Sequence, residues 1–131
     1  MKKSLIFASV LWLAAAAYLV AGSMAAAFNW TETTHNFGKI KQGKPVVAEF
    51  AFTNKGQAPL VITNARGSCG CTGVEFPKSA ILPGKEGKIK ATFNAAAVGT
   101  FSKTVTVESN AEGGLTTLAI TGEVVAEKAA R

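Results

Sequence analysis

Apolar and polar side chains alternate along much of the chain, which is the pattern of β-strands that bury one face. In residues 46–53, Ala48, Phe50 and Phe52 fall on one face, and residues 88–93 repeat this arrangement. Because successive side chains of a strand point to opposite faces, each such segment predicts a half-buried strand. The side chains that we expect to face inward are Phe37, Phe50, Phe52, Leu60, Ile62, Ile89, Phe93, Phe101, Val105, Val107, Leu118 and Ile120.

Clusters of Gly, Pro and Asn separate these segments at short, regular intervals. Strands of this spacing are typical of an immunoglobulin-like antiparallel β-sandwich, so we predict an all-β fold of about seven strands. No helical period is found outside residues 1–27. The widely spaced cysteine pair of antibody domains is absent, so apolar packing has to hold the core. The expected strands are residues 30–37, 46–53, 60–63, 72–76, 88–93, 101–108 and 115–124.

The N-terminal segment differs in kind from the rest of the chain. Two lysines precede an apolar stretch at residues 5–20, and small residues follow it. This order is typical of a secretory signal peptide, and we expect the mature chain to begin near Ala26 or Phe28. An uncleaved membrane anchor is the alternative, because about 20 apolar residues span a bilayer. The chain is thus divided into a signal peptide at residues 1–25, a β-sandwich at 28–125 and a frayed tail at 126–131.

Charge and composition narrow the classes of function. The chain carries 14 Lys and Arg against 8 acidic residues, and without residues 1–25 it keeps a net charge of +4. Only Arg66 and Arg131 are arginines, so a nucleic-acid surface is not expected. Nucleophilic catalysis needs Ser or Cys beside His and an acid, whereas this chain has one histidine, His35, and no Asp. We therefore predict a protein that is not an enzyme and binds no cofactor.

Cys69 and Cys71 flank a single glycine, Gly70, and form the one unusual motif. On a straight strand their Cα atoms would lie near the upper limit of disulfide geometry, about 6.8 Å, and Gly70 permits a bend that brings them closer. One alternative is a local disulfide that stabilises the fold by only roughly 1.5–2 kcal/mol, because its loop is so short. Another is a redox-active dithiol whose thiolate is stabilised by Arg66. The third is a Cu(I) or Zn²⁺ site, for which His35 is the only candidate imidazole ligand.

Several short motifs follow one another in an order that resembles a known family. They are Phe37-Gly38-Lys39-Ile40, Phe52-Thr53-Asn54-Lys55-Gly56, Pro59-Leu60-Val61-Ile62, Ser68-Cys69-Gly70-Cys71-Thr72, Leu82-Pro83-Gly84 and Gly122-Glu123-Val124. Over about residues 34–124 the chain resembles the DUF1573 family of bacterial envelope proteins, and it is similar to the wider immunoglobulin-like set of ASH and major-sperm-protein-like domains. The Ser-Cys-Gly-Cys-Thr run is the most specific part. The resemblance implies an exported immunoglobulin-like sandwich without established enzymatic activity, and it leaves the role of the two cysteines open.

Together these observations predict an exported, non-catalytic protein in the periplasm or outside the cell of a Gram-negative-type bacterium. We expect it to support or bind another envelope protein, with an exposed strand edge adding a strand of the partner. We expect no nucleic-acid partner and no stable membrane insertion after cleavage of the signal peptide. The alternative function is thiol-redox or metal handling through Cys69 and Cys71.

Overall fold

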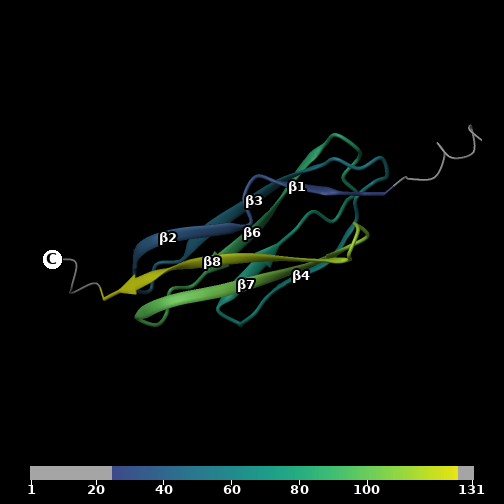
Figure 1. Cartoon of the computed structure of the whole chain (residues 1–131). Helices are drawn as coiled ribbons and strands as arrows, with labels where there is room; N and C mark the ends of the chain where they lie inside the picture. Colours follow the sequence, from purple (N-terminus) through teal and green to yellow (C-terminus); the bar gives the residue numbers. More distant parts are fainter. Residues whose placement is uncertain (1–24, 127–131) are drawn as a thin grey trace, which may run out of the picture.

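The computed structural model describes residues 25–126, which form two four-stranded sheets packed face to face (Figure 1). The predicted signal peptide up to residue 24 and the tail from residue 127 lie outside the described residues. No helix long and apolar enough to cross a membrane is found between residues 25 and 126. The eight strands are β1 (Phe28–Trp30), β2 (Thr34–Lys41), β3 (Val46–Asn54), β4 (Ile62–Gly67), β5 (Thr72–Glu75), β6 (Glu86–Phe93), β7 (Gly99–Ser109) and β8 (Leu115–Val125).

The expected strand at residues 30–37 is in fact two strands in different sheets, so the count is eight rather than seven. The chain crosses the edge of the sandwich at Thr31–Thr33, where Thr31 N donates to Ala51 O (3.0 Å) and Thr33 O accepts from Ala119 N (2.8 Å). One sheet has the order β1-β3-β6-β5 and the other β2-β8-β7-β4. After the crossing, β2 pairs with β8 in parallel. The prediction of a wholly antiparallel sandwich is wrong at this one pairing, and the other pairings are antiparallel.

The core lies between the sheets and consists of the predicted inward faces. Ten of the twelve expected side chains are buried, and the other two, Phe37 and Phe101, are partly buried against the same core. Phe37 is not fully buried because β2 is an edge strand. Phe101 is not fully buried because it lies beside a surface hollow at one end of the sandwich. Full burial of each large apolar side chain stabilises the fold by roughly 1.5–3 kcal/mol.

Asn54, at the end of β3, is a fully buried polar side chain that joins three segments of the chain. Its Nδ2 donates to Ala58 O and Ile81 O, both at 2.9 Å. Its Oδ1 accepts from Gly56 N at 2.9 Å and from Ala27 N at 3.3 Å. All the hydrogen-bonding capacity of the amide is used, so the cost of burying it is offset.

A bulge interrupts β2, the edge strand of its sheet. The register with β8 shifts between Asn36 and Lys39, and Gly38 between them has φ of 69°. Asn36 Oδ1 accepts a hydrogen bond from Gly38 N at 2.9 Å and holds the turn of the backbone. Bulges of this kind disturb the row of free backbone groups along an edge and disfavour pairing with another strand.

The described chain enters and leaves the sandwich at opposite ends (Figure 1). The start of β1 lies at one end of the long axis, and the end of β8 lies at the other. The Asn54 network is at the end where the chain enters, because Asn54 pairs with Phe28, the first residue of β1. The Cys-Gly-Cys motif is near the opposite end of the sandwich, because Thr72, which follows the motif, pairs with Phe93, the last residue of β6.

Candidate functional site

The Cys-Gly-Cys motif forms the connection between β4 and β5, and so it passes from one sheet to the other. Backbone hydrogen bonds hold this connection on both sides. Ser68 N donates to Thr104 O at 2.8 Å, and Asn94 N donates to Cys71 O at 3.1 Å. Both ends of the connection are therefore tied to neighbouring segments by bonds that do not involve sulfur.

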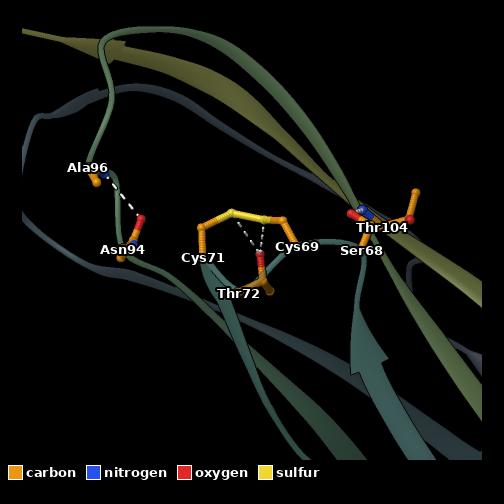
Figure 2. Close-up of a disulfide and its surroundings, with 7 residues drawn as sticks. All are labelled: Ser68, Cys69, Cys71, Thr72, Asn94, Ala96 and Thr104. Carbon is orange, nitrogen blue, oxygen red and sulfur yellow. Dashed lines mark hydrogen bonds between the residues drawn. A yellow bond between two sulfur atoms is a disulfide. The ribbon is translucent and has the colours of Figure 1, made fainter.

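The two sulfur atoms lie at disulfide distance, and Figure 2 shows them joined. The Cα atoms of Cys69 and Cys71 are 5.3 Å apart, inside the usual range for a disulfide. The motif forms a turn rather than a straight strand, and this shortens the separation below the limit reached by extended backbone. Thr72 is buried, and its hydroxyl lies 3.9 Å from Cys69 Sγ and 4.0 Å from Cys71 Sγ.

A hollow of about 200 Å³ opens beside Cys71 at this end of the sandwich. Its apolar part includes the rings of Phe93 and Phe101, which stack with centroids 4.2 Å apart, and the exposed side chain of Val98. Lys103 brings the one charged side chain in the lining. Cys71 lines the hollow, whereas Cys69 does not.

A lysine at an inward-facing position of β7 is the sequence feature that could have indicated this hollow. The inward face of the strand carries Phe101, Val105 and Val107. Lys103 occupies the inward position between Phe101 and Val105. A lysine at an inward position is uncommon, because burial of its charge is costly. It marks the place where the core ends and the hollow begins.

The structure does not bring the other candidate residues to the cysteines. The Arg66 side chain forms an ion pair with Glu108 of β7 at 3.5 Å, and both side chains are exposed. His35 Nδ1 lies 2.9 Å from Glu32 Oε1, and the imidazole packs edge-on against Phe37. Within residues 25–126 no three His, Cys, Asp or Glu side chains form a group that could hold a metal ion. The contacts of His35 given by the structure are thus with Glu32 and Phe37, its neighbours along the chain.

A family model with the description "Protein of unknown function (DUF1573)" matches residues 28–124, the whole of the sandwich except its last residue. The chain belongs to the DUF1573 family. The resemblance drawn from the sequence motifs is thus confirmed. No curated protein matches the sequence of this DUF1573 chain.

Solved structures similar to this DUF1573 domain share its fold at low sequence identity. A protein of unknown function from Porphyromonas gingivalis W83 matches with a TM-score of 0.66 and 13% identity, over 76% of this chain and 47% of that one. The VesB protease of Vibrio cholerae matches with a TM-score of 0.58 and 15% identity, over 76% of this chain and 31% of the protease. An ASH/PapD-like domain of human CEP192 matches with a TM-score of 0.60 and 10% identity, over 78% of this chain and 87% of that domain.

These likenesses establish an immunoglobulin-like fold of the ASH/PapD-like kind, and nothing finer. The present chain spans about half of the Porphyromonas protein and about a third of the protease. The domain from CEP192 is matched over most of its length, so the two sandwiches agree as whole units.

Proposed function

We propose that this DUF1573 chain is an exported, non-catalytic module that binds another protein of the bacterial envelope through the free edge of β4. The observation that carries the proposal is a complete sandwich whose edges differ sharply in how well they are protected. The likeness to an ASH/PapD-like domain is consistent with an interaction module. The signal-like N-terminal sequence supports export.

Three of the four sheet edges are poor templates for an added strand. β1 has three residues and β5 has four, and β5 is soon followed by Pro77. β2 is longer, but it contains the bulge at Gly38 and carries Lys39 and Lys41. Short strands, bulges, lysines and prolines are the usual protection of an edge.

β4 lacks most of this protection. It has six residues without proline or lysine, and after a register shift between Ile62 and Asn64 it pairs with β7 in regular register from Asn64 to Gly67. Its one charged side chain, Arg66, is paired with Glu108 on the neighbouring strand. Among the described residues no strand pairs with the other side of β4, so this side can accept an extended segment of a partner, which is the strand-addition mode of recognition.

Site-specific photo-crosslinking tests this proposal. A photoreactive residue at Thr63, exposed on β4, is expected to capture a discrete envelope protein in cells of the native bacterium. The same residue at Thr92, exposed on the central strand β6, serves as the matched control. Equal crosslinking at both positions, or none at Thr63, would count against binding at this edge. Fractionation of the same cells shows whether the protein is exported.

A further inference from the structure

The Cys69–Cys71 disulfide contributes little to folding and lies at the surface beside an apolar hollow. It closes a loop with a sequence separation of only 2, so it removes little chain entropy from the unfolded state. The backbone hydrogen bonds at Ser68 and Asn94 hold the connection independently. A bond with so small a structural role is available for chemistry.

The two sulfur atoms are not equivalent. Cys71 lines the hollow, and Asn94 and Ala96 lie on its side in Figure 2. Cys69 lies on the opposite side, toward Ser68 and Thr104. A thiolate attacks a disulfide in line with the bond that breaks. A nucleophile placed in the hollow therefore approaches Cys71 Sγ, with Cys69 Sγ as the leaving group.

Charge and hydrogen bonding favour the thiolate form of cysteine beside the hollow. Lys103 is the one ionisable side chain other than cysteine in the lining, which contains no carboxylate. A positive charge in the lining attracts an anionic nucleophile and favours the thiolate form of a nearby cysteine. The Thr72 hydroxyl, within hydrogen-bonding range of both sulfurs, can donate to the thiolate that leaves.

We propose that this hollow is a thiol–disulfide exchange site for a cysteine of an acidic peptide segment. The peptide thiolate attacks Cys71 Sγ and forms a mixed disulfide, while the Cys69–Cys71 bond breaks and its electron pair leaves on Cys69 Sγ. A second peptide thiolate then attacks the peptide sulfur of the mixed disulfide, and the electron pair of the bond that breaks leaves on Cys71 Sγ. The peptide thiols leave as a disulfide, Cys69 and Cys71 become a dithiol, and the peptide is oxidised by two electrons. The inference does not depend on strand pairing at β4.

Glutathione is a suitable probe, because it is a peptide with one thiol and a net negative charge, and cysteamine is a small thiol of opposite charge. The oxidised protein is mixed with each thiol, quenched with acid, alkylated and mapped by mass spectrometry. We expect folded protein to form the glutathione adduct mainly on Cys71, with the alkyl group on Cys69. Adducts shared equally between the sulfurs would overturn the proposal. So would folded protein that does not react when urea-unfolded protein does.

Variants of two lysines test the role of charge in the hollow. Lys103→Gln is expected to slow the reaction with glutathione by about threefold, since one nearby charge is lost, and not to slow the reaction with cysteamine. Lys55→Gln is the matched control, because Lys55 follows β3 at the end of the sandwich away from Phe93. Equal rates for the two variants with glutathione would refute the charge assignment. Far-ultraviolet circular dichroism confirms that each variant is folded.

Discussion

Replacing Asn54 with alanine should be among the most destabilising single changes in this domain. The substitution removes four side-chain hydrogen bonds at a fully buried position. Each contributes about 0.5–1.5 kcal/mol net, and each buried partner left without a bond adds to the loss. We expect Asn54→Ala to lower the free energy of unfolding by about 3–5 kcal/mol, out of a total of about 5–15 kcal/mol for a domain.

Urea unfolding of the mature chain, followed by circular dichroism, measures this free energy directly. Asn29→Ala is the matched control, because Asn29 is exposed on β1, and it should change stability by less than about 0.5 kcal/mol. A loss below about 1 kcal/mol for Asn54→Ala would show that water or a shifted loop replaces the network, and it would refute the reasoning.

The substitution Asn54→Asp separates the donor half of the network from the acceptor half. It keeps the shape and both acceptor contacts, but it places a carboxylate oxygen against Ala58 O and Ile81 O. Burial and these two carbonyls should raise the pKa of the introduced carboxyl in the folded state above its unfolded value. The variant therefore gains stability relative to the natural chain as the pH falls from 7 toward about 4. A penalty independent of pH would contradict this account.

Three further predictions concern packing and the start of the domain. Gly122→Ala should lower the free energy of unfolding by about 1–3 kcal/mol, because a Cβ there would lie 2.8 Å from Phe101 Cζ. Gly73 has open space around it, so Gly73→Ala should lower the free energy of unfolding by less than about 1 kcal/mol in the same urea assay. A chain that begins at Phe28 should melt several degrees below one that begins at Ala25, since it loses the contacts of residues 25–27 with the loop after β3; equal melting temperatures would contradict this. Phe50→Ala should lower the free energy of unfolding by about 3–5 kcal/mol, because the ring is fully buried. Calorimetry measures this loss, and a clearly smaller value would contradict the burial of the ring.

Alternation of side chains predicted most of the fold because it reports burial directly. The faces of β3, β6, β7 and β8 follow from it, and their large apolar residues are buried as expected. The crossing at Thr31–Thr33 was missed, because β-prone residues lie on both sides of it and no Gly or Pro marks the break. The parallel pairing of β2 with β8 could not be predicted either, since it depends on which sheet the chain enters after the crossing.

The candidate site was only partly predictable, because it too depends on contacts between segments that are distant in the sequence. The closeness of Cys69 and Cys71 follows from their spacing, but the hollow depends on how β6, β7 and the loop between them meet. The network of Asn54 could not be predicted, because the partners of this side chain come from three separate segments that only the folded chain brings together. Local patterns report propensity and burial, whereas partners distant in the sequence are set by tertiary packing.

The parallel pairing of β2 with β8 and the placement of the chain ends have a mechanical consequence. A force that pulls the described ends apart runs along the strands, because the chain enters and leaves at opposite ends of the long axis (Figure 1). Such tension loads the β2–β8 hydrogen bonds together in shear and does not unzip them one by one. The 11 residues of β8 extend over about 35 Å, so the domain can act as a stiff link between whatever is attached to its two ends.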